Sequence, residues 1–110
     1  MTHSEIIARV CAAAPVIPVL TIERLEDAQP LARALVAGGL PALEITLRTD
    51  AALEAIAAIA EVEGAIAGVG TLLTPTQVRN AKSAGAIFGV SPGATPILVA
   101  AAQEFDLPLL

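Results

Sequence analysis

The sequence predicts an α/β fold made of the first four to five units of a parallel TIM (β/α)8 barrel, preceded by an N-terminal helix. Short apolar segments alternate with helical ones, and their starts lie 20 to 26 residues apart. No two-residue hairpin turn joins these segments, and one of them has a polar face, which together favour parallel strands around a polar mouth. The expected strands are Val16–Leu20, Ala42–Leu47, Ile66–Val69, Ile87–Val90 and Leu107–Leu110.

Helix-start signals support this division of the chain. A capping residue, followed by a helix-compatible proline or by a reciprocal Glu or Gln, opens three segments. These signals are Thr2 with Glu5, Thr74 with Pro75 and Gln77, and Thr95 with Pro96. Gly38 and Gly85 follow helical segments and can take the left-handed conformation that ends a helix. We therefore expect one partial barrel domain over 1–110, with a leading helix over 1–14 and strands 1 to 5 with their helices over 15–110.

The second expected strand distinguishes a barrel from an open doubly wound sheet. Its residues alternate between apolar Leu43, Ile45 and Leu47 and polar Glu44, Thr46 and Arg48. Successive strand residues face opposite sides, so one side of this strand is polar. An internal strand of a doubly wound sheet is apolar on both sides, whereas a barrel mouth can be polar. A complete barrel needs about 250 residues, so the chain is expected to be an incomplete barrel.

Composition and charge exclude several classes of function. The chain has 110 residues and a net charge of −5, which disfavours binding to the phosphates of nucleic acid. It has one cysteine, Cys11, and one histidine, His3, too few for a disulfide or a Cys/His metal site. We expect Cys11 to be a small buried residue and His3 to be solvated. Charged residues interrupt every apolar stretch, so no membrane span is expected, and a reducing cytoplasm fits the cysteine count.

Candidate functional residues follow the ends of consecutive expected strands, where barrel active sites form. Glu44 in a partly desolvated mouth suits proton transfer, unless it is a structural carboxylate. Arg48 could bind a carboxylate or phosphate, or be a solvated surface residue; extended-strand spacing disfavours an ion pair with Glu44. Gly70-Thr71 lets the backbone approach a ligand and supplies a hydroxyl, or is a plain turn. Ser91-Pro92-Gly93 leads to a helix start that could attract an anion, or is a rigid turn.

These motifs resemble the 2-keto-3-deoxy-6-phosphogluconate (KDPG) and 4-hydroxy-2-oxoglutarate (KHG) aldolases. The resemblance covers the chain from about Pro15 and lies in L-E-I-T-L-R-T, G-V-G-T and S-P-G, in that order and spacing. It implies class I Schiff-base cleavage of KDPG to pyruvate and glyceraldehyde 3-phosphate, or of KHG to pyruvate and glyoxylate, within Entner–Doudoroff carbohydrate metabolism. It implies that Glu44 is the general acid/base and that Arg48 and Thr71 hold the pyruvate carboxylate. It further implies no metal or organic cofactor, a small 2-keto acid as the partner, and a cytoplasmic homotrimer when full length.

The chain departs from the family in one respect. The resemblance places the imine lysine on the sixth strand and the phosphate site on the last loops, both beyond Leu110. The one lysine present, Lys82, falls inside the helical segment after Pro75 and is expected to be solvated. The 110-residue chain alone is therefore expected to be inactive. Two alternatives stay open: another phosphate-handling TIM-barrel enzyme, and a non-catalytic half-barrel that self-associates.

Overall fold

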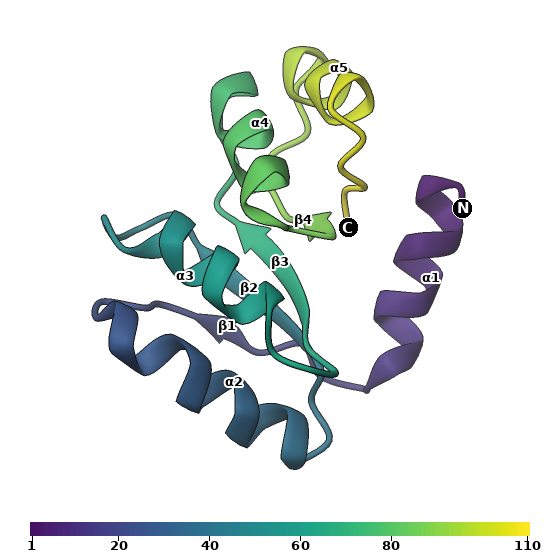
Figure 1. Ribbon diagram of the computed structural model, residues 1–110. Coiled ribbons are helices and arrows are strands. Elements are labelled where there is room, and N and C mark those ends of the chain that lie inside the picture. Colours follow the sequence, from purple (N-terminus) through teal and green to yellow (C-terminus); the bar gives the residue numbers. More distant parts are fainter.

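The computed structural model describes residues 1–110 as alternating helices and strands (Figure 1). In chain order the elements are α1 (His3–Ala13), β1 (Val19–Leu20), the short 3-10 helix η1 (Leu25–Asp27), α2 (Ala28–Ala37), β2 (Ala42–Thr46), α3 (Ala52–Ala60), β3 (Ile66–Gly70), α4 (Pro75–Ala84), β4 (Phe88–Gly89) and α5 (Pro96–Glu104). The capping boxes at Thr2 and Thr74 and the Thr95 cap are all present. The left-handed glycine after α4 is Gly85 as predicted, but after α2 it is Gly39 and not Gly38.

The four strands form one sheet in the order β1-β2-β3-β4, and every pair is parallel. Strand β2 ends one residue earlier than predicted, at Thr46, and β3 ends one residue later, at Gly70. Strands β1 and β4 are shorter than predicted by two residues or more. Strand β1 covers only the end of 16–20, since Pro18 has no N–H to donate to a ladder. Strand β4 covers two residues, although hydrogen bonds from the flanking N–H groups of Ile87 and Val90 extend its contact with β3. The fifth predicted strand pairs with β4 through a single bridge between Gly89 and Leu109.

The four helices that follow strands cover one face of the sheet. Helix α2 packs on α3, α3 on α4, and α4 on α5, so that consecutive helices are neighbours (Figure 1). A doubly wound fold would divide these helices between both faces. Parallel strands with all their helices on one side form part of a (β/α) barrel, as predicted.

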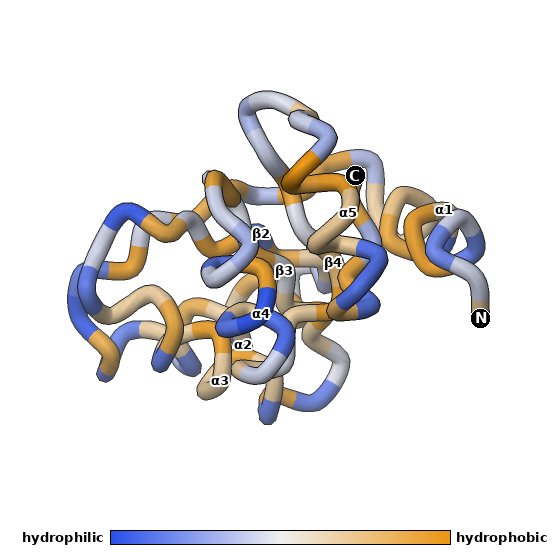
Figure 2. The backbone as a smooth tube through the Cα atoms, turned by 90° about the horizontal axis from the view of Figure 1, so that it is seen from above, coloured by the Kyte–Doolittle hydropathy of each residue, from blue (hydrophilic) through white to orange (hydrophobic).

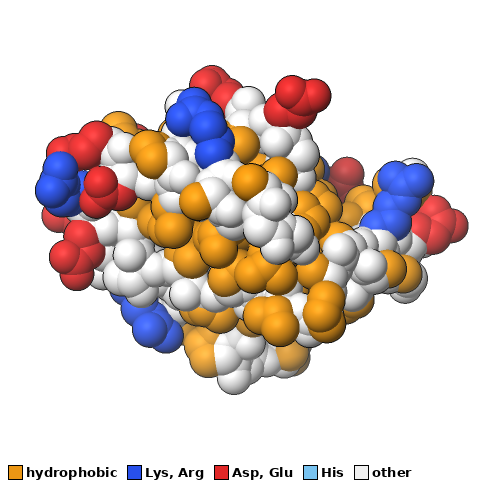
Figure 3. Space-filling model, turned by 90° about the horizontal axis from the view of Figure 1, so that it is seen from below, with side chains coloured by type: hydrophobic (Ala, Val, Ile, Leu, Met, Phe, Trp, Pro, Cys, Tyr) orange, Lys and Arg blue, Asp and Glu red, His pale blue; other side chains and the backbone are white.

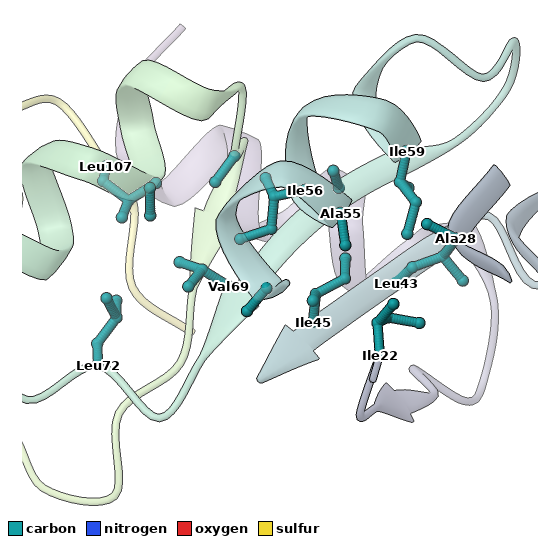
Figure 4. Packing of buried hydrophobic residues seen from close by; sticks show 14 of the residues in the cluster. Ile22, Ala28, Leu43, Ile45, Ala55, Ile56, Ile59, Val69, Leu72 and Leu107 are labelled. Atoms are coloured by element: carbon teal, nitrogen blue, oxygen red, sulfur yellow. The ribbon is translucent and has the colours of Figure 1, made fainter. Parts of the chain in front are cut away.

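The main core lies between the sheet and these helices. Leu43 and Ile45 of β2 and Val69 of β3 are fully buried against Ile56 and Ile59 of α3 (Figure 4). The predicted alternation on β2 is confirmed, because these apolar side chains face the helices while Glu44 and Thr46 face the other side of the sheet. Hydropathy follows the same arrangement, with hydrophobic segments around the sheet and hydrophilic ones in the peripheral turns (Figure 2).

Helix α1 packs against the amino-terminal ends of the strands. Val10 of α1 joins Ala42 of β2 and Phe88 of β4 in a second buried cluster. Cys11 is exposed, contrary to the prediction, because successive residues of a helix point about 100° apart and Val10 occupies the buried stripe. His3 is half-buried, and its Nε2 lies 2.8 Å from Oδ1 of Asp106.

An apolar groove of about 420 Å³ runs beside α1. It is lined by Met1, Ile6, Arg9, Val10, Ala65, Ile66 and Ile87. Seen from below, the molecule has a broad apolar patch across its centre with charged side chains at the margins (Figure 3). None of the helices combines the length and the apolar character that a membrane span requires.

Candidate active site

A cavity of about 210 Å³ lies at the carboxyl ends of strands β2, β3 and β4. It is lined by Glu44, Arg48, Thr71, Val90, Ser91 and Pro92. The three residues predicted to act on a substrate, Glu44, Arg48 and Thr71, therefore share one cavity, although 27 positions separate the first from the last. Parallel strands bring their carboxyl ends to one edge of the sheet, and this edge carries the cavity.

Glu44 lies in the middle of β2 and is only 9% exposed. Its register partner is Gly68, and its side chain extends along the sheet over Gly70 of β3. No protein hydrogen bond reaches its carboxylate, and no salt bridge pairs it. Burial raises the pKa of the Glu44 carboxyl above its ordinary value, while the positive charge of Arg48 partly offsets that rise. A carboxyl group in such surroundings can hold or release a proton closer to neutral pH.

Arg48 lies in the turn after β2 and is exposed. Strand β2 ends at Thr46, so the strict alternation of faces does not reach Arg48. No carboxylate forms a salt bridge with its guanidinium, which agrees with the expectation that Glu44 and Arg48 do not pair directly. An unpaired guanidinium at the rim of a cavity can donate two hydrogen bonds to the oxygens of a carboxylate or phosphate. The Thr46 hydroxyl makes a structural contact, since it donates to the carbonyl of Leu20 at 3.1 Å and so links β2 to β1.

Thr71 follows β3 directly and has a φ of 61°, in the left-handed region. A β-branched residue in that region is a genuine outlier. Backbone strain of this kind concentrates at functional sites, where the surrounding structure holds it in place. We expected Gly70 to let the backbone come close to a ligand, but the group that lies against Gly70 in this structure is the Glu44 side chain.

The Ser91-Pro92-Gly93 segment contributes two residues to the cavity wall. The Ser91 hydroxyl is occupied locally, because it accepts from the Gly93 N–H at 3.2 Å and donates to the Gly93 carbonyl. Thr95 then caps α5 by accepting from the Leu98 N–H at 3.2 Å. Val90 is the lining residue that sequence reasoning missed, and its place at the end of the fourth expected strand was the available signal.

Two further observations define what this cavity can do. Lys82 is exposed on α4 and does not line the cavity. No group of three or more His, Cys, Asp and Glu side chains gathers where a metal ion could bind. One cavity wall thus combines a carboxyl group that can exchange a proton, a guanidinium that can bind an anionic group and a hydroxyl group that can donate a hydrogen bond.

Comparisons of sequence and of structure both find similarity to KDPG and KHG aldolases. The family model described as "KDPG and KHG aldolase" matches residues 7–110. The KHG/KDPG aldolase of Escherichia coli K12 is 53% identical over 97 residues, which are 87% of this chain and 46% of that protein. The 2-keto-3-deoxy-6-phosphogluconate aldolase of Zymomonas mobilis ZM4, solved with 3-phosphoglycerate, superposes with a TM-score of 0.93 at 49% identity, over 99% of this chain and 52% of that one.

A third relative carries a bound reaction species. The KDPG aldolase of Legionella pneumophila, solved with pyruvate captured at low pH as a covalent carbinolamine intermediate, superposes with a TM-score of 0.86 at 47% identity, over 92% of this chain and 50% of that one. The chain spans about half the length of the curated relatives it matches.

Proposed function

Since the chain belongs to the KDPG and KHG aldolase family, we propose that residues 1–110 form the first part of a class I aldolase barrel, with a leading helix over 1–14 and strand–helix units over 15–110. The proposed reaction is the cleavage of KDPG to pyruvate and glyceraldehyde 3-phosphate, of KHG to pyruvate and glyoxylate, or of both. The observation that supports this function best is the meeting of Glu44, Arg48 and Thr71 in one cavity at the carboxyl ends of the strands.

Each of the three residues has a role that its surroundings favour. Glu44 transfers protons during imine formation and C–C cleavage, because burial raises its pKa and leaves both carboxylate oxygens without a protein partner. Arg48 binds the carboxylate of the 2-keto acid through its unpaired guanidinium. Thr71 donates its hydroxyl to the same carboxylate.

The proposed reaction also needs a lysine amine that adds to the 2-keto carbon. Lys82 cannot supply it, because its side chain lies on the exposed side of α4 and outside the cavity. We propose that the nucleophile comes from sequence outside residues 1–110. The covalent carbinolamine in the Legionella pneumophila relative supports this chemistry, since a carbinolamine is the adduct of an amine and a ketone. No metal or organic cofactor takes part in the proposed steps.

We also propose that the working protein is a cytoplasmic homotrimer that acts on a small 2-keto acid and binds no nucleic acid. The net charge of −5 supports the last point. The trimer rests on the family relationship. Sedimentation equilibrium of the active protein checks it, and a monomer would contradict it.

The test of the function is a hybrid aldolase in which this chain replaces the matched segment of the Escherichia coli relative. Pyruvate release from KDPG and KHG is followed through lactate dehydrogenase. We expect the hybrid to cleave these substrates and the 110-residue chain alone to release no pyruvate. Glu44→Gln should lower kcat by roughly 100-fold or more, and Arg48→Met should raise KM by roughly tenfold or more.

Lys82→Arg is the matched control, because it keeps the charge but could not form the imine at neutral pH, and we expect it to leave kcat and KM unchanged. Turnover by the chain alone, or full activity of the Glu44→Gln hybrid, would contradict the proposal.

A further inference from the structure

Gly70 is packed against the side chain of the proposed proton-transfer residue. A Cβ atom built on Gly70 would lie 2.8 Å from Cδ and 2.9 Å from Cγ of Glu44, and closer still to Oε2. Real Cβ atoms essentially never come within 3.0 Å of a heavy atom outside their own residue and its two chain neighbours. The observed position of Glu44 is therefore compatible only with glycine at residue 70.

Backbone conformation does not explain this glycine. Positive φ angles occur at Gly39, Gly64 and Gly85, but not at Gly70, which lies inside a regular strand. Gly70 pairs with Thr46 in the sheet and is itself buried. A glycine inside a strand weakens it, unless another group needs the space. Here the group that occupies the space is the Glu44 side chain.

Gly68, on the same face of β3, also leaves space for a side chain from another strand. The Cβ position of Gly68 is occupied by the ring of Phe88, which belongs to the buried cluster against α1. Strand β3 thus carries two glycines two residues apart, one that admits an aromatic core residue and one that admits a carboxylate. Only the second of them lies beside the cavity.

We propose that Gly70 is a positioning residue, whose missing side chain forms the niche that holds the Glu44 carboxylate in the wall of the cavity. This inference rests on the proposed function for its catalytic consequence, but the placement of Glu44 can be measured without turnover. A methyl group at residue 70 would force the Glu44 side chain to rotate out of the niche. Because that side chain is flexible, it can move towards solvent without disturbing the sheet.

Displacement towards solvent predicts a change in titration. Arg48 is the charged group that acts on Glu44, and none of the strands β1, β3 and β4 carries a titratable residue. Loss of burial should therefore lower the pKa of the Glu44 carboxyl towards its ordinary value. In the enzyme, a misplaced proton-transfer group should lower kcat more than it changes KM.

The first experiment is an NMR titration of the Glu44 side-chain carboxyl in the 110-residue chain. It compares the unaltered chain with Gly70→Ala and with Gly38→Ala. Gly38 is the matched control, because a methyl there meets only the carbonyl oxygens of Ala34 and Leu35, at 3.4 and 3.6 Å. We expect a lower Glu44 pKa in Gly70→Ala alone. An identical Glu44 pKa in all three proteins would overturn the inference.

The second experiment measures turnover in the hybrid aldolase. Gly70→Ala should lower kcat at least tenfold in the Glu44 background and have no further effect in the Glu44→Gln background. An equal loss in both backgrounds would show that Gly70 acts other than through Glu44 and would overturn the inference. If Glu44→Gln itself keeps full activity, the proposed function fails, while the titration still decides whether Gly70 positions Glu44.

A third variant keeps the inference testable if Gly70→Ala fails to fold. Adding Glu44→Ala removes the side chain that the new methyl would meet. Recovery of folding in the double variant would support the inference. Continued unfolding would overturn it, because the clash would then be with something other than Glu44.

Discussion

Replacing Glu44 with glutamine should change how the stability of the chain depends on pH. Glu44 as a residue is 9% exposed, and its carboxylate accepts no protein hydrogen bond. Burial raises the folded-state pKa of this carboxyl despite the opposing charge of Arg48. The folded state therefore binds this proton more tightly than the unfolded state. Its contribution to stability is fully present below the unfolded pKa and is lost as the pH rises through the folded pKa.

The size of the effect follows from the single proton involved. Between the unfolded and folded pKa values, the free energy of unfolding of the unaltered chain should fall with a slope of at most about 1.36 kcal/mol per pH unit relative to Glu44→Gln. Glutamine has nearly the same shape and does not titrate. The difference between the two unfolding free energies should be flat below this window, slope within it, and become flat again above it.

Urea unfolding from about pH 3 to about pH 8 measures these curves, and subtracting one from the other cancels every other titrating group. Arg48→Met provides a second check. It removes the charge that lowers the pKa of Glu44, so the sloping window should extend to higher pH. Parallel curves for the unaltered chain and Glu44→Gln would refute the assigned burial of Glu44. A slope of the opposite sign would mean that charge pairing outweighs desolvation.

Three further predictions concern the packing of Gly68, the backbone of Thr71 and the pair formed by His3 and Asp106. Gly68→Ala should destabilise the chain by about 1–3 kcal/mol in denaturant unfolding, because the new methyl overlaps the buried Phe88 ring. Phe88→Leu should recover part of this loss in the double variant, and strictly additive losses of stability from the two substitutions would contradict the packing argument. Thr71→Gly should raise the free energy of unfolding by up to about 1 kcal/mol. Relief of roughly 1–2 kcal/mol of left-handed backbone strain exceeds the entropic cost of glycine, which is about 0.5–1 kcal/mol. A clear loss of stability would show that Thr71 is unstrained. The hydrogen bond from His3 holds the pKa of Asp106 below its ordinary value and gives stability that is lost as the pH falls through the folded pKa. His3→Ala should raise that pKa in an NMR titration, and an unchanged value would remove His3 as the cause.

Much of the fold could be predicted because it depends on local patterns. The alternation of Leu43, Glu44 and Ile45 shows which side of β2 faces the helices, since side chains in a strand alternate with period two. Capping residues such as Thr74 locate helix starts, because the first N–H groups of a helix need an acceptor. Strand lengths were less predictable. The predicted strand Ile87–Val90 has no polar side chain, but β4 covers only Phe88–Gly89, because the ladder depends on how closely neighbouring strands approach.

The errors also have physical causes. Cys11 is exposed because the rotation of α1 about its axis is set by packing on Phe88, and the composition of an alanine-rich helix does not fix that rotation. The choice between Gly38 and Gly39 as the left-handed residue depends on where the last helical hydrogen bonds form. Boundaries of this kind shift by one or two residues without a change in pattern.

The sequence by itself determined the parallel strand–helix repeat, the polar side of β2 and the order of Glu44, Arg48 and Thr71 along successive strand ends. The periodicity of side chains and the connectivity of parallel strands are sufficient to predict these three features. Only the tertiary structure decided that Gly70 makes room for Glu44, that Thr71 takes a left-handed backbone and that the charge of Arg48 acts on Glu44. These relations depend on the register between β2 and β3 and on the path of the turns that follow them, which bring together residues far apart in the chain.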